Sequence, residues 1–395
     1  MTAPPAALAA LSAMRGAALR TVIAIPARDE ADCLPACLAA LAAQRPAEAL
    51  AGTAVLLLAN NCSDGTAAAA RAMAPDLPFP LVVLEAALPP GRAHAGGARA
   101  AAMEAAAALL GEVPGGALLC TDADARPEPG WLAANLAELA AGADAVAGAV
   151  LPDPAEAARL PATLRRREAE EARYAALLDE MAARIDPIAH DPGPTHGTHS
   201  GASIALRLAA WRAVGGIPLV PRGEDRALFA ALARRDARIR HSEAARVLVS
   251  CRLDGRAGGG MAATLRRRLA DPHALVDDRL EPARRAWLRL RTRRALRLLR
   301  AGAPRPGNPL RLQIALGIAP AAMRRVLSAS SFGLAWEALQ AATPALRRVP
   351  LDPAALPRET AIAAAILAAV RATDLARNLA VPADPAGSAR PAAAG

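Results

Sequence analysis

The sequence predicts an α/β protein with a mostly parallel, doubly wound sheet, followed by a helical, arginine-rich extension at its C-terminal end. Short apolar runs alternate with segments of helical periodicity through the first 150 residues. Polar side chains directly follow three of these runs, in segments 26–30, 60–66 and 121–125. In a sheet of this class, the carboxyl ends of the strands are where ligands bind.

Five strands are expected in the first part of the chain, because each is a short, buried-type run of Val, Ile, Leu and Ala. Helices are expected between them, the first with Cys33, Cys37 and Leu41 on one face and Asp32 as its N-cap. The expected strands cover residues 21–26, 53–59, 81–86, 116–121 and 143–150.

The second part of the chain is expected to be mainly helical. Residues 165–184 have the pattern of a charged helix, and residues 190–201 have no periodicity and are expected to form a long loop. A strand, a helix and a turn should follow up to residue 218, and another helix should begin near Glu224. Past residue 260 the pattern is helical and rich in arginine.

Charge divides the chain into two parts. Residues 256–395 hold 23 Arg against 9 Asp and Glu, a formal charge of +14, whereas residues 1–255 carry −4. We therefore expect a catalytic α/β domain over 18–256, a basic helical region over 257–380 and a disordered tail over 381–395. The chain has no lysine, which indicates a codon bias toward arginine, so its basicity does not by itself predict nucleic-acid binding.

The sequence favours a cytoplasmic location. The five cysteines are scattered and match no metal pattern, as is usual for reduced thiols. The N-terminal residues make a poor signal peptide, because the arginines follow the apolar stretch. The apolar run 361–370 is too short to span a bilayer. A peripheral position at the inner membrane surface stays open.

Asp122 and Asp124 come directly after an expected buried strand. A turn at the strand end can aim both carboxylates at one point, and Mg²⁺ or Mn²⁺ accepts such oxygen ligands together with substrate phosphates. The alternative is a solvated turn in which Asp124 caps the next helix.

The ordered segments Pro-x-Arg-Asp-Glu, Asn-Asn-Cys-Ser-Asp-Gly-Thr, Asp-Ala-Asp and Gly-Glu-Asp resemble family-2 glycosyltransferases of the GT-A fold, over roughly residues 18–256. The resemblance implies a GT-A-type sheet and a nucleotide-sugar donor. It places Asn60 where the family usually has an acid that contacts the base, and an Asn amide can still pair with a pyrimidine edge. Asp64 is expected to cap a helix instead. The resemblance also implies a set of donor-binding positions, in which Asp122 is counted as well as in the metal pair. These positions are Pro26, Ala27, Arg28, Glu30, Asn60, Arg99 and Asp122.

The resemblance also implies a catalytic pair, Glu224 and Asp225. The acid at the position of Asp225 is the family's general base for inverting transfer, which takes the proton of the acceptor hydroxyl. Glu224 then orients its neighbour or the acceptor. Without the resemblance, both acids would be explained by a favourable place at a helix N-terminus.

Three further features leave alternatives open. Arg252 and Arg256 lie beside a glycine run, and this loop either folds over a diphosphate or serves as a linker. The loop with His190, His196 and His199 matches no standard zinc site, and His241 is expected at the surface. The basic helix 284–300 either lies on an anionic membrane or packs its apolar edge against the protein.

The sequence thus predicts a metal-dependent, inverting, hexosyltransferase-like enzyme that moves a sugar from a UDP- or GDP-sugar to a hydroxyl acceptor. Two alternatives stay open: a sugar-nucleotide pyrophosphorylase, and a non-catalytic arginine-rich adaptor for nucleic acid or membrane. No nucleic-acid partner is expected for the transferase.

Overall fold

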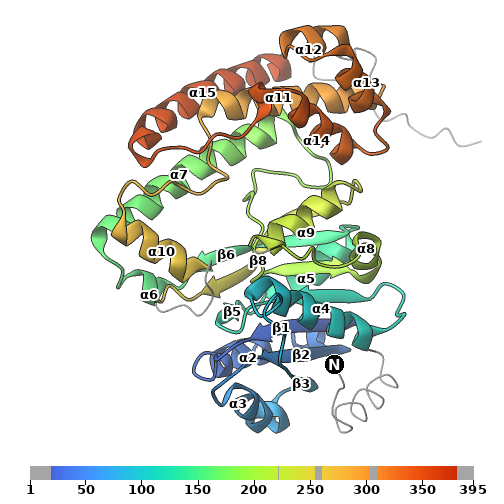
Figure 1. The fold of residues 1–395 in the computed structure, drawn as a ribbon, viewed down its shortest axis with the longest axis vertical. Coiled ribbons are helices and arrows are strands. Elements are labelled where there is room, and N and C mark those ends of the chain that lie inside the picture. Colours follow the sequence, from blue (N-terminus) through green and yellow to red (C-terminus); the bar gives the residue numbers. More distant parts are fainter. Residues whose placement is uncertain (1–18, 221, 254–259, 303–308, 380–395) are drawn as a thin grey trace, which may run out of the picture.

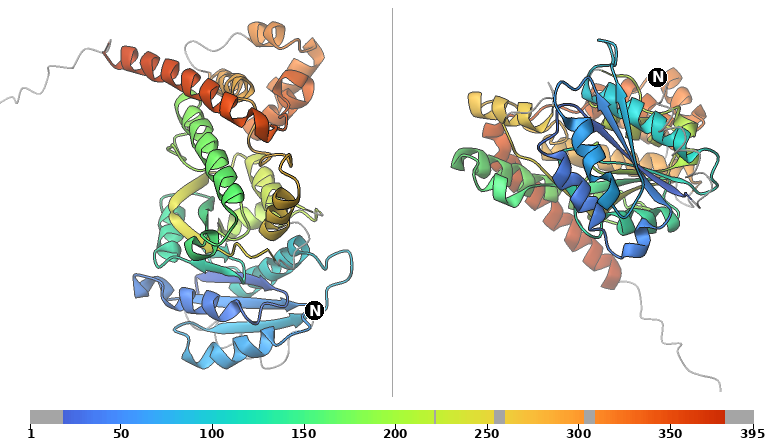
Figure 2. Two further views of the ribbon diagram at one scale, coloured as in Figure 1. Left: turned by 90° about the vertical axis from the view of Figure 1, so that its left-hand side faces the viewer. Right: turned by 90° about the horizontal axis from the view of Figure 1, so that it is seen from below.

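A computed structural model describes residues 19–220, 222–253, 260–302 and 309–379 of the chain. A mixed sheet with helices on both faces occupies one end of the molecule, and a group of helices occupies the other (Figure 1). The long helix α7 leads from the first part toward the second, as both side-on views show (Figures 1 and 2). Arg256 and the tail expected over 381–395 lie outside the described residues.

The eight strands form one sheet in the order β3-β2-β1-β4-β7-β6-β8-β5. Four of its seven strand pairs are parallel, and the three pairs β4–β7, β6–β7 and β5–β8 are antiparallel. The expected α/β class and mostly parallel sheet are confirmed. The strands are β1 Thr21–Ala27, β2 Thr53–Asn60, β3 Leu81–Ala86, β4 Ala117–Cys120, β5 Ala125–Pro127, β6 Ala145–Pro152, β7 Ile204–Arg207 and β8 Ile239–Val249.

The central strands are apolar throughout because both faces of the sheet are covered. In β1, Val22 and Ala24 belong to one buried cluster, and Ile23 and Ile25 belong to the other. The chain order reverses between β1 and β4, so the loops that follow these strands diverge and leave a crevice at the carboxyl edge.

Helices cover both faces of the sheet. The cluster that contains Val22 includes buried residues of α4, α8 and α9, and the cluster that contains Ile23 includes those of α2 and α5. The helices of this part are α2 Leu34–Ala42, α3 Thr66–Met73, α4 Ala95–Leu110, α5 Trp131–Ala140, α8 Leu208–Val214 and α9 Glu224–Ala233, with the short 3-10 helices η1 Ala47–Leu50 and η2 Ala74–Asp76.

One local expectation needs correction. Helix α2 begins after Cys33 and has no side-chain cap, so Asp32 is not its N-cap. Helix α4 begins at Ala95 and includes Gly96 and Gly97. A Cβ on Gly97 would lie 2.2 Å from the carbonyl oxygen of Arg92, so the glycine lets the preceding turn pack against the helix.

The antiparallel strand β7 follows from the path of the chain. After β6 the chain stays on the carboxyl side of the sheet through α6, α7 and the loop 186–203, and it must therefore re-enter the sheet in the opposite direction. The expected loop at 190–201 thus lies over the crevice. The remaining helices are α6 Pro154–Ala157, α7 Ala162–Ile185, α10 Met261–Ala270, α11 Ala283–Arg300, α12 Pro309–Ala315, α13 Pro320–Ser328, α14 Phe332–Ala342 and α15 Leu356–Leu379, with the 3-10 helices η3 Pro344–Leu346 and η4 Pro353–Ala355.

Helix α7 packs against the basic C-terminal helices. Its Tyr174 and Met181 share a buried cluster with residues of α11 and α15, and the Tyr174 hydroxyl donates a hydrogen bond to the Glu281 carbonyl at 2.7 Å. In α11, Trp287 and Leu288 pack into two adjoining clusters. The apolar residues of the basic helix therefore contact other helices, as the packing alternative requires. The domain limits at 256/257 and 380/381 remain predictions.

The apolar C-terminal stretch is longer in the structure than the ten-residue run suggested. Residues 353–374 form a helical segment of 22 residues with a mean hydropathy of 1.3, long and apolar enough by composition to cross a membrane. Only 17% of an 18-residue stretch of this segment is buried inside the protein. Ala363 and Leu367 of the segment pack against α7 and α11.

Candidate active site

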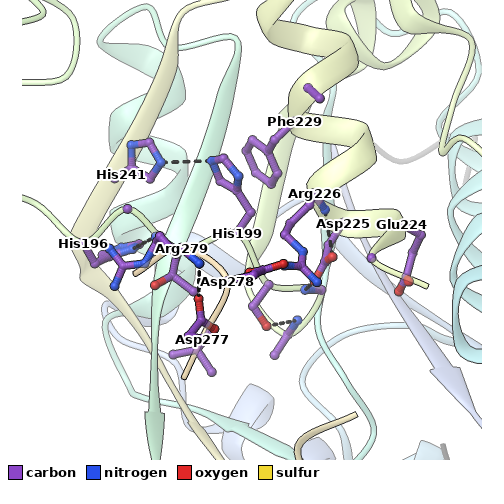
Figure 3. A pocket seen from close by; sticks show the side chains of 18 of the residues that line it. His196, His199, Glu224, Asp225, Arg226, Phe229, His241, Asp277, Asp278 and Arg279 are labelled. Atoms are coloured by element: carbon purple, nitrogen blue, oxygen red, sulfur yellow. Dashed lines mark hydrogen bonds and ion pairs between the residues drawn. The ribbon is translucent and has the colours of Figure 1, made fainter. Parts of the chain in front are cut away.

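A large cavity, of about 1880 Å³, opens beyond the carboxyl ends of β1, β2 and β4. It also extends between α7, α9 and the C-terminal helices. Figure 3 shows its wall beside α9, where Asp225, His199 and Arg279 lie. The cavity is lined by every described residue that the sequence singled out for donor binding, catalysis or metal binding: Pro26, Ala27, Arg28, Glu30, Asn60, Arg99, Asp122, Asp124, Glu224, Asp225 and Arg252.

The loops after β1 and β2 are held together by hydrogen bonds. The Ser63 backbone N–H donates to the Asp29 carboxylate at 2.6 Å, and this bond lowers the pKa of Asp29. Asp64 accepts from the Thr66 N–H at 3.0 Å at the start of α3, although the N-cap position itself is Gly65 and not Asp64 as expected. These bonds fix the end of β2, where Asn60 is buried and its side-chain oxygen has no hydrogen-bond partner in the described part of the chain.

Asp122 and Asp124 lie in the turn after β4, each paired with one arginine. Arg99 donates to Asp122 at 2.7 Å, and Arg252, which follows β8, donates to Asp124 at 3.1 Å and to Glu30 at 2.6 Å. Burial raises the pKa of Asp124 to about 6, with a further contribution from the charge of Asp122. At this edge of the sheet, two arginines thus pair with four carboxylates, because Arg99 also contacts Glu224.

Arg99 is the buried centre of the site. Its side chain is 7% exposed, and its guanidinium contacts both Asp122 and Glu224, the latter at 3.1 Å from Nε. It also donates to the Gly201 carbonyl at 2.9 Å. A Cβ on Gly201 would lie 2.0 Å from the Arg99 Cζ, so only glycine allows this approach. Gly96 similarly allows Glu224 to pack on α4, since its Cβ would lie 3.1 Å from that of Glu224.

Asp225 lies beside Glu224 in the first turn of α9 but has a different environment. Gly223 precedes them with φ of 71°, a conformation that favours glycine. Glu224 points to Arg99, whereas Asp225 accepts from the Gly201 N–H at 3.1 Å and lines the cavity (Figure 3). Burial raises the pKa of Asp225, and Glu224 adds to this effect. A carboxylate with a raised pKa, facing a cavity, is suited to accept a proton.

The histidine loop is connected to β8 through a chain of hydrogen bonds. His241 is not a free surface residue as expected, because its Nδ1 lies 2.7 Å from the Asp191 carboxylate and its Nε2 lies 3.1 Å from Nε2 of His199. The His199 ring stacks on Phe229 of α9, with ring centroids 4.3 Å apart (Figure 3). The Nδ1 of His241 and the Asp191 carboxylate share one hydrogen bond, and the two Nε2 atoms share another, so the two rings and the carboxylate form one connected chain. The pKa of His199 is lowered to about 3, chiefly by burial and then by the neighbouring positive groups.

The sequence patterns did not find Asp191, Phe229 or Arg279 as parts of this wall. Arg279 donates to Asp179 of α7 at 2.8 Å and lines the cavity beside the histidine loop. Asp191 and His241 are 50 residues apart, and no local motif connects them. A tightly spaced group of Asp, Glu, His or Cys ligand atoms is formed, among the described residues, by Asp29, Cys62 and Asp64.

Replacing Arg99 by Gln should lower the free energy of unfolding by about 3 kcal/mol, because it leaves two carboxylates without their cation. Glu224→Gln should cost less in the Arg99→Gln background than in the wild type, with a coupling of about 1 kcal/mol or more. Urea unfolding of the two single variants and the double variant measures this. Arg71→Gln is the control, since the ion pair of Arg71 with Glu85 is exposed. Its loss should lower the free energy of unfolding by less than about 1 kcal/mol. Strictly additive effects of Arg99→Gln and Glu224→Gln would contradict the buried ion-pair arrangement.

His199 should make the protein sensitive to acid. Because its folded pKa of about 3 lies below the ordinary value of 6.5, the unfolded chain binds a proton that the folded chain refuses. The free energy of unfolding should therefore fall as the pH drops from about 6.5. His199→Asn should make this decline shallower in urea unfolding between neutral and acidic pH. If His199→Asn instead lowers the free energy of unfolding by the same amount at every pH, its pH dependence is unchanged. In that case His199 stabilises the protein only by packing on Phe229.

Comparisons with known proteins agree with the arrangement at this edge of the sheet. Residues 22–191 match the model of the family described as glycosyl transferase family 2. No curated protein matches the chain. The chain is similar to the solved structure of S. aureus TarS 1-349 in complex with UDP, at 14% identity over 70% of this chain and 66% of that chain, with a TM-score of 0.42.

Two other solved structures are similar to the chain. The mannosyltransferase PcManGT from Pyrobaculum calidifontis, in complex with GDP-Man and Mn²⁺, is 20% identical over 95% of this chain and 92% of that chain, with a TM-score of 0.41. Glucosyl-3-phosphoglycerate synthase from Mycobacterium tuberculosis, in complex with Mg²⁺ and UDP, is 16% identical over 66% and 82%, with a TM-score of 0.36. Residues 22–191 of this chain are thus similar to glycosyl transferase family 2, and the motifs that suggested this family line the cavity.

Proposed function

We propose that the protein transfers a sugar from a UDP- or GDP-sugar to a hydroxyl group of an acceptor, with inversion at the anomeric carbon and with the help of a divalent cation. The observation that carries the proposal is the ion-pair bridge through Arg99. This residue connects Asp122, on the donor side, to Glu224, beside the general base Asp225, within one cavity.

The donor side would be formed by the ends of β1 and β2. Pro26, Ala27 and Arg28 supply a wall for the nucleoside. Arg28 is about half exposed and donates to the Ala93 carbonyl at 3.3 Å, a contact that its guanidinium would exchange for a phosphate. Asn60 is buried beneath this wall with an unpartnered side-chain oxygen. An amide can both donate and accept hydrogen bonds, as recognition of a base edge requires. The residues do not discriminate between uracil and guanine.

Asp122 and Asp124 fit a divalent cation. They supply hard oxygen ligands, and the two arginines at this point, Arg99 and Arg252, are shared among four carboxylates. Mg²⁺ or Mn²⁺ held there would neutralise the charge of the donor diphosphate and of the leaving nucleotide. Arg252 can turn its guanidinium to the same diphosphate, since a planar fork suits phosphate oxygens. Arg256, outside the described residues, follows in the same segment.

Asp225 would act as the general base. Its carboxylate faces the cavity and accepts hydrogen bonds from the Gly201 N–H at 3.1 Å and from the Arg226 N–H at 2.7 Å. It would take the proton of the acceptor hydroxyl as that oxygen attacks the anomeric carbon, while the nucleotide diphosphate leaves from the opposite face. Glu224 is a positioning residue, because its carboxylate is engaged by Arg99. Through Gly201, Arg99 also holds the backbone that positions Asp225.

The family match favours glycosyl transfer over the two alternatives, a pyrophosphorylase and a non-catalytic adaptor. The segment after β1 is not a glycine-rich phosphate loop of the kind that a pyrophosphorylase uses. A cytoplasmic location, with a peripheral contact between the basic C-terminal region and an anionic membrane, remains part of the proposal.

Asp225→Asn should lower the transfer rate by about 10²- to 10⁴-fold, because it keeps the shape of the side chain but removes the basic oxygen. Donor affinity should hardly change, since the diphosphate is held by other residues. In the wild type the rate should fall toward acidic pH as Asp225 is protonated. The pH at which the rate falls should lie above the range in which an ordinary carboxylate is protonated, since burial raises the pKa of Asp225. Release of UDP or GDP with a panel of acceptors measures the rate, and titration calorimetry measures donor affinity.

Asp278→Asn is the matched control, because Asp278 lies in the same wall but forms only an exposed ion pair with Arg226 (Figure 3). It should retain most of the activity. Glu224→Gln should be milder than Asp225→Asn if its role is to position its neighbour. Near-normal turnover in Asp225→Asn, with normal donor affinity, would exclude Asp225 as the base while leaving the donor site intact.

A further inference from the structure

The end of the cavity away from the sheet is lined by arginines of one helix. Arg289, Arg293 and Arg297 recur at every fourth position of α11, so they lie on one face of the helix, and all three line the cavity. Arg348, from the segment before α15, lines it as well. We call these four residues the arginine group.

Two members of the arginine group have good partners. Arg289 pairs with Glu281 at 2.9 Å, lies over the Trp336 ring at 5.7 Å and donates to the Leu346 carbonyl at 2.6 Å. Arg297 makes two hydrogen bonds to the Asp186 carboxylate, at 3.1 and 3.2 Å. These arginines hold α11 against its neighbours, and their contacts are explained by the fold.

Arg293 is different. Its Nε lies 3.4 Å from the Asp186 carboxylate, which Arg297 already occupies, and this nitrogen is buried and makes no hydrogen bond in the described part of the chain. The side chain keeps 36% of its surface open, and it lines the cavity. A guanidinium that lines a cavity, with one shared carboxylate as its ion-pair partner among the described residues, is incomplete without an acceptor of hydrogen bonds.

The arginine group also carries an excess of positive charge. Its four guanidinium groups face two carboxylates, Asp186 and Glu281, which leaves two positive charges unbalanced. Burial lowers the pKa of Arg293, and Arg297, Arg289 and Arg348 lower it further against the opposing effect of Asp186. A phosphate monoester carries about −1.5 to −2 at neutral pH and matches this charge.

We propose that the arginine group is a subsite for a phosphate group of the acceptor, with Arg293 as its principal ligand. The proposal rests on the proposed function, because it assigns a class of acceptor to the same cavity. Arg293 offers a planar fork that binds phosphate oxygens in pairs, and Arg297 can share them because it lies beside the same carboxylate.

The position of the subsite also constrains the acceptor's length. Arg297 lies over the Phe332 ring at 4.2 Å, and the Phe332 N–H donates to Asp236, just past the end of α9. Asp225 lies at the other end of α9, a helix of ten residues that is roughly 15 Å long. An acceptor that reaches both places is therefore extended, with its phosphate about one helix length from the reacting hydroxyl. A soluble phosphorylated saccharide and a lipid with a phosphate head group both have this chemistry.

The test compares three full-length proteins: the wild type, Arg293→Gln and Arg294→Gln. Arg294 is the matched control, because it has the same charge on the same helix but is not among the residues that line the cavity. Inorganic phosphate is titrated against each protein at constant ionic strength, and the midpoint of thermal unfolding is followed. The wild type and Arg294→Gln should be stabilised by phosphate, and Arg293→Gln should bind it at least tenfold more weakly. Without phosphate, Arg293→Gln should unfold at the same or a higher temperature, since it removes an unbalanced charge.

Equal phosphate affinity of Arg293→Gln and the wild type, or a marked loss of stability in Arg293→Gln without phosphate, would overturn the proposal. Vesicles of phosphatidylcholine, with and without phosphatidic acid, distinguish the two sources. Arg293-dependent binding to phosphatidic acid indicates a lipid head group, and Arg293-dependent binding of soluble phosphate alone indicates a soluble acceptor. UDP and GDP binding with Mn²⁺ is measured in parallel and should be unchanged in Arg293→Gln. Loss of nucleotide binding in all three proteins would instead contradict the proposed function and leave the phosphate result standing.

Discussion

The arrangement of the site depends on one buried guanidinium. Arg99 lies in the first turns of α4, and it pairs with an acid that follows β4 and with an acid that begins α9. Two carboxylates brought near each other in a poorly solvated place repel, and burial adds to the cost of their charge. One arginine between them reverses this balance and connects two segments that are more than 100 residues apart. Removing it would leave both carboxylates without a partner, which is much more costly than the loss of an exposed pair.

The bridge requires particular backbone positions. Gly201 gives the guanidinium room to reach the loop carbonyl, and Gly96 gives Glu224 room to lie on α4. The loop that contains Gly201 is held on its other side by the chain from Asp191 through His241 to His199. The backbone N–H of Gly201, in the same loop, donates a hydrogen bond to Asp225 and positions it. Asp122, Asp225 and the histidine loop are thus connected through Arg99 and Gly201 by hydrogen bonds.

The sequence predicted the parts of this unit that depend on local patterns. Apolar runs of five to eight residues define the central strands, and polar groups directly after them mark the carboxyl edge where Asn60, Asp122 and Asp124 lie. The glycine before Glu224 marks the start of α9. The resemblance to a known family pointed to Arg99, but as a donor contact, and the structure places its guanidinium among carboxylates instead.

Contacts that depend on the path of the chain could not be predicted. The direction of β7 is set by where the chain re-enters the sheet, and a four-residue apolar run carries no information on that. The pairing of Asp191 with His241 and the position of Arg293 over a cavity depend on how α7 and α11 pack. The local sequence around Asp191 shows only an acid in a loop, and the local sequence around Arg293 shows only one arginine among many. His241 was expected at the surface for the same reason.

We propose that this edge of the sheet is a nucleotide-sugar site completed by a cation on Asp122 and Asp124. Titration calorimetry of UDP and GDP with the full chain tests this most directly, with Mn²⁺ or with EDTA, in the wild type and in Asp124→Asn. We expect at least one nucleotide to bind the wild type in Mn²⁺, and EDTA or Asp124→Asn to weaken this binding strongly. Equal nucleotide affinity in Mn²⁺ and EDTA, or in the wild type and Asp124→Asn, would contradict it.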